Sequence, residues 1–219
     1  MQMRTFQKIN LFLIFFFGLS FLAFVFLNGG ALAANLRYSL LWHTPLVDAD
    51  LKTENLVDVN LPAGVHPLSA SEVKEMTLSI PKIDVNAPVI LASEESNQGI
   101  LTALESGVGL FPDSAKPGAE GRAIILGHSS RGSWYRGNYA YVFALLPKLE
   151  TYDEFYITTD HTKLVYQVFS KKIMTKAEAN TLFNTPTIGS EVNLMTCYPI
   201  GSASKRTVIQ AKLVRSEAI

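Results

Sequence analysis

The chain has 219 residues, one cysteine and a formal charge of zero at pH 7, with 19 basic and 19 acidic residues. This length is enough for one ordinary domain together with an anchor and a connecting segment. The charge balance argues against a nucleic-acid-binding protein, which needs a basic face, and against a strongly acidic disordered chain. A single cysteine forms no intrachain disulfide, so a packed core must hold the fold together.

Residues 9–27 form an almost wholly apolar run near the N-terminus. As a helix, this run would be roughly 28 Å long, close to the hydrocarbon thickness of a bilayer. Arg4 and Lys8 precede it, and positive charge on that side favours a cytoplasmic N-terminus. We predict one transmembrane anchor within residues 1–34, with the remainder of the chain outside the cytoplasm.

The same region also fits a cleaved signal peptide. Ala31-Leu32-Ala33 followed by Ala34 has the small-residue spacing that a signal peptidase accepts. The apolar run is longer than the roughly 7–15 residues usual for a signal-peptide core, which favours a retained anchor. Either alternative places the rest of the chain outside the membrane.

Residues 35–74 keep no regular hydrophobic period and contain several prolines, which interrupt regular elements. Residues 36–42 are compatible with an interfacial extension of the anchor helix, with Tyr38 and Trp42 at the level of the headgroups. We interpret residues 35–74 as a membrane-proximal spacer and residues 75–219 as one folded domain.

From residue 76 onward, short apolar runs alternate with turn residues at intervals typical of a barrel or sandwich. The predicted strands are residues 76–80, 88–91, 123–126, 154–159, 164–171, 191–196 and 207–214. Two short helical pieces are predicted at residues 99–104 and 141–146. Many strands with few helices predict a mainly all-β fold, a closed or nearly closed antiparallel β-barrel.

Cys197 stands at the end of a predicted strand, directly after Thr196. A lone cysteine is ordinarily a small buried hydrophobe, but a thiol at the end of a strand can face a groove. A catalytic thiol also needs a proton-transfer partner, a cation near the developing oxyanion and room for an extended peptide.

Four histidines are candidates for proton transfer. His43 and His66 lie in the spacer and His161 lies in a polar turn, so these three are interpreted as solvated residues. His128 follows Gly127 at the end of an apolar run, where a buried strand delivers it to the start of a loop. Taken alone, His128 also fits a structural histidine at a strand end.

Arg206 lies nine positions after Cys197, at the start of the last predicted strand. An intervening loop of that length allows this strand to return antiparallel, so that Arg206 flanks the thiol. Its planar guanidinium would then donate to a substrate carbonyl or an oxyanion. A solvent-exposed arginine is the alternative, since the neighbouring Lys205 shows that charge alone is not diagnostic.

These residues resemble the motifs of the sortase family. Leu-Met-Thr-Cys at residues 194–197 resembles the family's Thr-Leu-x-Thr-Cys motif, although Asn193 stands where the first threonine usually does. Gly127-His128-Ser129 resembles the sortase histidine motif, and Arg206 falls where the family carries its arginine. Leu-Ser-Ile-Pro-Lys-Ile at residues 78–83 resembles the opening strand, and the resemblance extends over residues 76–214 in motif order and spacing.

The resemblance implies an eight-stranded β-barrel cysteine transpeptidase in residues 75–219. By that likeness, Cys197 attacks the Thr–Gly carbonyl of an LPxTG-like sorting signal and forms a thioester. His128 protonates the leaving amine and later deprotonates the incoming one, Arg206 steadies the oxyanion, and Thr196 helps to position the substrate. The implied partners are surface proteins with such signals, an amine acceptor from a cell-wall precursor or a pilin, and the membrane, without a cofactor or a metal.

The single anchor and the Ile-Pro-Lys-Ile opening are more similar to class D or E sortases than to the pilin-polymerising type. The latter type carries an Asp-Pro-aromatic lid and a second hydrophobic helix. Residues 174–190 contain Glu178 as their one acidic residue, so a calcium site of the kind found in some class A members is not expected.

Two other functions stay open at the level of sequence. A cysteine protease would hydrolyse the same thioester, because water and an amine compete for one intermediate. A non-catalytic, membrane-tethered peptide-binding β-domain would keep Cys197 buried and far from His128. The sortase interpretation instead places both residues on one groove, with Arg206 on the other side of the thiol.

Overall fold

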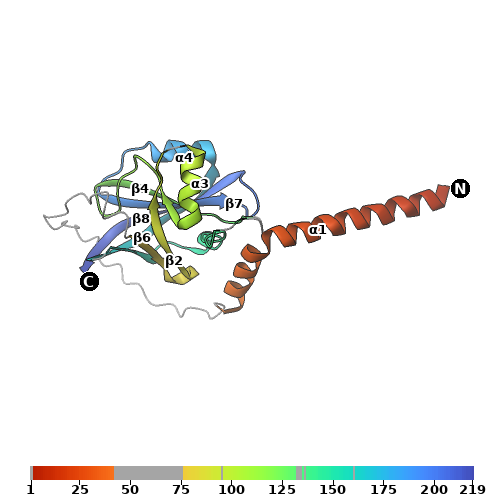
Figure 1. The fold of residues 1–219 in the computed structure, drawn as a ribbon, viewed down its shortest axis with the longest axis horizontal. Coiled ribbons are helices and arrows are strands. Elements are labelled where there is room, and N and C mark those ends of the chain that lie inside the picture. The colour runs from red at the N-terminus through yellow and green to blue at the C-terminus, as the bar shows by residue number, and fades with distance from the viewer. Residues whose placement is uncertain (1, 42–75, 95, 132–134, 136, 160) are drawn as a thin grey trace.

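The computed structural model describes residues 2–41, 76–94, 96–131, 135, 137–159 and 161–219. A barrel forms the body of the molecule, and a long helix projects from it (Figure 1). The elements are α1 (Gln2–Leu41), β1 (Thr77–Ile80), η1 (Pro81–Ile83), β2 (Val85–Leu91), α3 (Asn97–Ser106), β3 (Val108–Leu110), β4 (Gly121–Leu126), η2 (Leu146–Lys148), β5 (Glu154–Thr158), β6 (Thr162–Thr175), α4 (Lys176–Phe183), β7 (Ser190–Tyr198) and β8 (Lys205–Ala218).

The eight strands close into a barrel in the order β1-β2-β3-β4-β7-β8-β6-β5, with β5 paired to β1. This confirms the predicted closed barrel with short helices. The sheet is mixed, however, because β2 and β3 are parallel, as are β4 and β7. The prediction of an antiparallel sheet was therefore wrong at these two pairs. Each parallel pair is joined by a crossover, through α3 in the first case and through β5, β6 and α4 in the second.

Three local elements differ from the sequence prediction. Strand β3 has only three residues, all buried, and is too short to produce a recognisable alternation. The helix predicted at residues 141–146 was wrong, because this stretch forms tight i→i+3 turns such as Ala144 N to Tyr141 O at 2.9 Å, and Pro147 then removes a donor. Helix α4 was not predicted, although Thr175 and Glu178 form a capping box at its start.

The barrel interior is filled by alternate side chains of the strands. The burial of β1 alternates along its length, as expected for a strand with one face on the core. Phe155 and Tyr166 stack inside the barrel with ring centroids 5.6 Å apart. Burying each large apolar side chain contributes about 1.5–3 kcal/mol, so the interior accounts for most of the barrel's stability. The hydroxyl of Tyr166 accepts a 2.7 Å hydrogen bond from Gly118 N and lies 3.2 Å from Ser190 Oγ.

Helix α1 runs without a break from Gln2 to Leu41, across the predicted boundary at residue 34. Over Phe12–Leu40 it is long and apolar enough to cross a membrane, a property that an N-terminal signal sequence shares. Its first part projects away from the barrel, and it changes direction where it reaches the barrel (Figure 1). Residues 42–74 of the predicted spacer lie outside the described residues.

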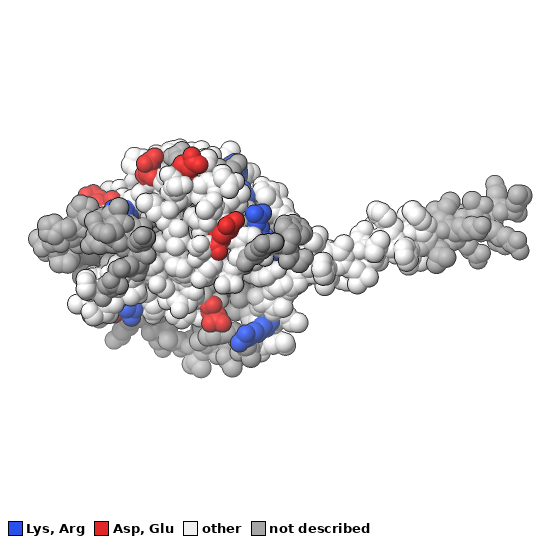
Figure 2. All heavy atoms as spheres, viewed as in Figure 1, with Lys and Arg blue, Asp and Glu red and all other residues white. Residues whose placement is uncertain are grey.

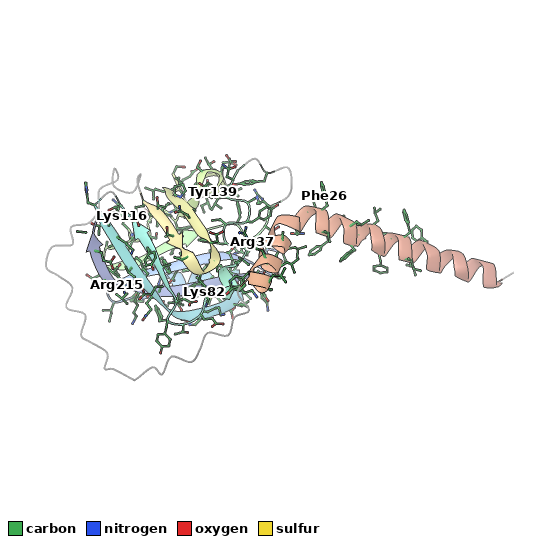
Figure 3. The ribbon with its side chains drawn as sticks, turned by 90° about the horizontal axis from the view of Figure 1, so that it is seen from below. Phe26, Arg37, Lys82, Lys116, Tyr139 and Arg215 are labelled. Atoms are coloured by element: carbon green, nitrogen blue, oxygen red, sulfur yellow. The ribbon has the colours of Figure 1, made fainter. Side chains whose placement is uncertain are left out.

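The surface agrees with the balanced composition. Acidic and basic side chains are few and interspersed on the face in Figure 2, and the projecting stretch of α1 carries neither wherever it is described. In the view of Figure 3, Phe26 lies on the projecting part of α1, whereas Arg37 lies beside the barrel on the same side as Lys82. The C-terminal part of α1 therefore packs on the domain and does not continue into solvent.

Candidate active site

The parallel pairing of β4 and β7 brings His128 and Cys197 to the same level of the barrel. The pair extends past its last rung, because Gly127 N donates to Met195 O at 3.1 Å and Thr196 Oγ1 donates to Gly127 O at 2.8 Å. His128 and Cys197 follow directly, one from each strand, and both line a single groove. The register of β4 with β7 thus brings His128 and Cys197 together. The alternation of apolar residues in the sequence does not specify this register.

Arg206 lies across the antiparallel pair from Cys197, as the sequence predicted. The two residues are register partners on β8 and β7, and Cys197 is free and partly exposed. Arg206 Nη1 donates to the carbonyl oxygens of Ala203 and Lys205, both at 2.9 Å. These bonds leave Nη2 and Nε unengaged by the part of the chain that the structure describes. The guanidinium is therefore held at the same groove as the thiol, with donors to spare.

His128 lies in a partly desolvated niche of the groove. Its ring meets Tyr135 edge-on with centroids 5.4 Å apart, and the Tyr135 hydroxyl donates to Leu104 O at 2.7 Å. Nε2 is buried and has no hydrogen-bond partner among the described residues. Burial, and to a lesser extent the positive charge of Arg131, lower the pKa of His128 to about 4. The imidazole is therefore neutral at pH 7.

The groove has a volume of about 590 Å³ and lies between α3 and α4. Its lining includes His128, Cys197 and Arg206 together with many apolar side chains. The apolar lining comes from Leu27, Ile100, Leu101, Leu104, Phe111, Leu126, Ala179, Phe183 and Met195. Caps fix the two helices, with Ser96 accepting from Gly99 N at α3 and the capping box at α4. A groove lined by a thiol and by many apolar side chains suits a peptide with apolar residues near the reacting carbonyl.

Thr196 and Gly127 link the strands that carry the candidate catalytic residues. Thr196 is buried, and its hydroxyl is committed to Gly127 O. A Cβ on Gly127 would lie 2.3 Å from the ring of Phe143, whose N–H donates to His128 O at 2.9 Å. Glycine before His128 therefore lets a core phenylalanine pack beneath the loop. Thr196 lines the groove as well, and its role in substrate binding stays a prediction.

Asn193, where this sequence departs from the sortase motif, belongs to a buried polar network. Arg122 Nε bonds Glu191 Oε1 at 3.1 Å, with both side chains largely buried. With its amide oriented to match its neighbours, Asn193 donates to Glu191 Oε1 at 2.9 Å and accepts from Arg122 Nε at 3.3 Å. Arg122 Nη1 also donates to Leu182 O at 2.6 Å, which ties the end of α4 to β4. The asparagine thus completes a network that supports one wall of the groove.

The remaining histidines and carboxylates lie elsewhere. His161 is exposed in the turn between β5 and β6 and does not line the groove, while His43 and His66 lie outside the described residues. Glu178 caps α4 through Thr175. Among the residues that the structure describes, no three or more His, Cys, Asp or Glu side chains form a group able to hold a metal ion.

Arg131 and Asn28 are among the groove residues that were missed at the level of sequence. Arg131 lies 5.6 Å from the ring centroid of Tyr135, and its charge acts on His128. Its position three residues after the histidine was the one available signal. Asn28, from the end of the apolar run, also lines the groove. Nothing in the sequence pairs it with residues about one hundred positions away.

The fold and the groove together define a closed β-barrel that presents a free cysteine beside a histidine and an arginine. The sequence model of the sortase domain matches residues 78–214. Over 191 residues, which are 77% of this chain and 88% of the relative, the chain is 26% identical to Sortase D of Bacillus subtilis (strain 168).

Solved structures show the same likeness. The chain is similar to a lid mutant of Sortase A from Corynebacterium diphtheriae, with a TM-score of 0.54, 27% identity and coverage of 65% of this chain and 70% of that one. It is also similar to the pilus-related Sortase C of Group B Streptococcus, with a TM-score of 0.54, 27% identity and coverage of 68% and 70%. The chain belongs to the sortase family, a family of cysteine transpeptidases that sort surface proteins.

Proposed function

We propose that this sortase cleaves an LPxTG-like sorting signal between Thr and Gly and transfers the surface protein to an amine of the cell wall or of a pilin. The observation that carries the proposal is a partly exposed thiol that shares one groove with an imidazole and a guanidinium. The non-catalytic alternative required Cys197 to be buried and remote from His128, and the geometry supports the opposite arrangement.

The chemistry proceeds in two acyl transfers on Cys197. Neutral His128 accepts the thiol proton as Sγ attacks the Thr carbonyl, and the same proton leaves on the glycine amine when the C–N bond breaks. The incoming amine then gives a proton to His128 as it attacks the thioester, and Sγ departs to be reprotonated. Each step keeps the proton count balanced, with His128 alternating between base and acid.

Arg206 would stabilise both tetrahedral intermediates. Its Nη1 is held by Ala203 O and Lys205 O, so the side chain is oriented before the substrate arrives. The remaining guanidinium donors would bond the oxyanion or the peptide carbonyl beside it. Such preorganised donors contribute about 3–4 kcal/mol to the transition state, because they need no reorganisation during the reaction.

The apolar lining of the groove would receive the leucine and proline of the sorting signal. Ile100, Leu101 and Leu104 of α3 face Ala179 and Phe183 of α4 across the groove, and all five are groove-lining residues. An extended peptide entering between the helices would place its apolar residues there and its Thr–Gly bond at Cys197. We further propose that α1 anchors the enzyme in the cell membrane as a single span, with the barrel outside the cytoplasm.

The full chain in detergent micelles, with a fluorogenic LPxTG-type peptide and an added oligoglycine or diaminopimelate-like amine, tests the proposal. Mass spectrometry follows the products, and Cys197→Ala is the control. Amine-ligated product that disappears in Cys197→Ala is the expected result. Hydrolysed peptide alone would identify a cysteine protease instead, and no turnover over a panel of sorting peptides would identify a peptide-binding domain.

A further inference from the structure

The C-terminal part of α1 has one buried face, although the span that precedes it is exposed. Asn28 and Ala31, three residues apart, are 6% and 0% exposed, and Tyr38 two turns later packs against the core of the barrel. This spacing puts all three on one side of the helix. Lys148 Nζ also lies 5.5 Å from the ring centroid of Tyr38. The helix therefore docks on the domain along a defined face, and the dock begins at Asn28, directly after the apolar run.

Asn28 contacts both loops that leave the candidate catalytic residues. Ser130 Oγ, two residues after His128, donates to Asn28 Oδ1 at 2.6 Å. Gly201, in the turn that follows Cys197, comes so close that a Cβ there would lie 2.7 Å from Asn28 Oδ1. Asn28 Nδ2 donates to Phe24 O at 3.0 Å, which fixes the amide on its own helix. One side chain of the anchor helix thus touches the two loops whose relative position sets the distance between thiol and imidazole.

The close approach of the helix depends on glycine. At Gly30 a Cβ would lie 2.3 Å from the aromatic ring of Tyr141, whereas at Gly29 a Cβ would meet nothing within 4 Å. Small residues let a helix backbone approach its neighbour in this way. Leu27 and Asn28 then form part of the groove wall together with His128, Cys197 and Arg206.

We propose that Asn28 is a positioning residue and that Leu27 and Asn28 of the anchor helix form a fixed wall of the active-site groove. This inference rests on the transpeptidase function proposed above. The dock holds the loops after His128 and Cys197 in register, so the barrel alone would be an incomplete enzyme.

The adjacent glycines provide a matched pair of variants in the full chain in detergent micelles. Gly30→Ala inserts a methyl group against the ring of Tyr141, so that the helix or the ring must shift, while Gly29→Ala makes the same chemical change facing open space. We expect Gly30→Ala to lower kcat/KM with an LPxTG-type peptide at least tenfold and Gly29→Ala to change it less than twofold. A small displacement of catalytic groups is enough for such a loss. Equal activity of the two variants would overturn the inference.

If Asn28 served only to attach the helix to the barrel, its substitution would not be expected to change kcat and KM to different extents. Asn28→Ala removes the bond to Ser130 and should lower kcat roughly three- to tenfold with a smaller change in KM, because the substrate wall is kept and the loops lose their register. Gly30→Ala combined with Tyr141→Ala restores room for the methyl group and should recover most of the lost kcat. A rise in KM alone for Asn28→Ala, or no recovery in the double variant, contradicts the positioning role.

A readout without peptide turnover separates this inference from the proposed function. Cys197 is the one cysteine of the chain, so iodoacetamide reports on its surroundings directly. Displacing the wall should speed alkylation of Cys197 several-fold in Gly30→Ala and leave the rate in Gly29→Ala at the wild-type value. Equal alkylation rates in Gly30→Ala and Gly29→Ala would refute the proposal that the anchor helix forms a wall of the groove, even if the enzyme turns over peptide. Unequal rates in a chain that cleaves no sorting peptide would contradict the proposed transpeptidase function but would still support the docking of the anchor helix.

Discussion

Strands β4 and β7 carry a polar cluster at each end, and the two clusters are built in opposite ways. Near their starts, Arg122, Glu191 and Asn193 satisfy one another, and Arg122 also holds the carbonyls at the end of α4. At their ends lie His128 and Cys197. Among the described residues, the buried side-chain atoms without a partner are His128 Nε2, Arg131 Nε and Thr207 Oγ1, and all three lie at or beside the groove.

The difference separates stability from function. A buried polar group without a partner costs about 1–3 kcal/mol, so native proteins rarely keep one unless a ligand uses it. At the starts of β4 and β7, no buried side-chain polar atom of the described residues lacks a hydrogen-bond partner, and the cluster there stabilises the barrel. Their ends lie near buried polar atoms that have no partner among the described residues, and they carry the thiol and the imidazole of the groove.

The largest effect is expected at the unpaired end. His128→Gln should lower turnover of an LPxTG-type peptide by about 10²–10⁴-fold, because it removes the proton carrier. The melting temperature at pH 7 should stay nearly unchanged, since Nε2 has no hydrogen-bond partner among the described residues. Steady-state kinetics and calorimetry on the same samples check both parts. A large drop in melting temperature would mean that His128 is structural.

The paired end should respond through stability instead. Arg122→Met leaves Glu191 buried without its cation and should lower the free energy of unfolding by about 3–5 kcal/mol. Urea denaturation measures this change. Arg215→Met, which breaks an exposed pair with Glu154, is the control and should cost less than about 1 kcal/mol. Similar losses of unfolding free energy in Arg122→Met and Arg215→Met would contradict the distinction between the buried and the exposed ion pair.

A smaller loss is expected from Tyr166, whose hydroxyl joins Gly118 N and Ser190 near the starts of the same strands. Burial raises the pKa of Tyr166 to about 12, so the group stays a neutral hydrogen-bonding hydroxyl. Tyr166→Phe should lower the free energy of unfolding by about 1–2 kcal/mol. The same substitution at the exposed Tyr152 should change it by less than about 0.5 kcal/mol. Equal values for the two tyrosines would contradict the prediction.

The smallest effect is a pH dependence that His128 confers on stability. Its folded pKa of about 4 lies below the ordinary value of 6.5, so the unfolded chain binds more protons between these two values. Stability from this group is complete above pH 6.5 and falls as the pH drops toward 4. After allowance for partial exposure, the loss is on the order of 1 kcal/mol. Denaturation curves at pH 7 and pH 4.5 should show a smaller difference in His128→Gln than in the wild type, and an unchanged difference would refute it.

Much of the barrel was predictable because its strands are locally encoded. All seven predicted strands are present, since alternation of apolar residues and turn residues follows directly from the pleat. Strand β3 was not predictable, because three buried residues carry no period. The parallel pairing of β4 with β7 was missed because it depends on how a long crossover returns, which the strand sequences do not state.

The candidate site was predictable to the extent that it lies at strand ends. Cys197, His128 and Arg206 each close or open a strand, and their order resembles a known family. Arg131 and Asn28 were missed because their partners are set by tertiary packing. The bond from Ser130 to Asn28 joins residues 102 positions apart, and no local pattern records such a contact.

The most direct test of the central claim is intact-protein mass spectrometry of the full chain after brief mixing with an LPxTG-type peptide in the absence of an added amine. We predict a covalent adduct with the mass of the peptide fragment that ends at Thr, removed by hydroxylamine and absent in Cys197→Ala. Peptide cleavage without that adduct, or an adduct that persists in Cys197→Ala, would contradict a thioester on Cys197 and with it the assigned chemistry of the groove.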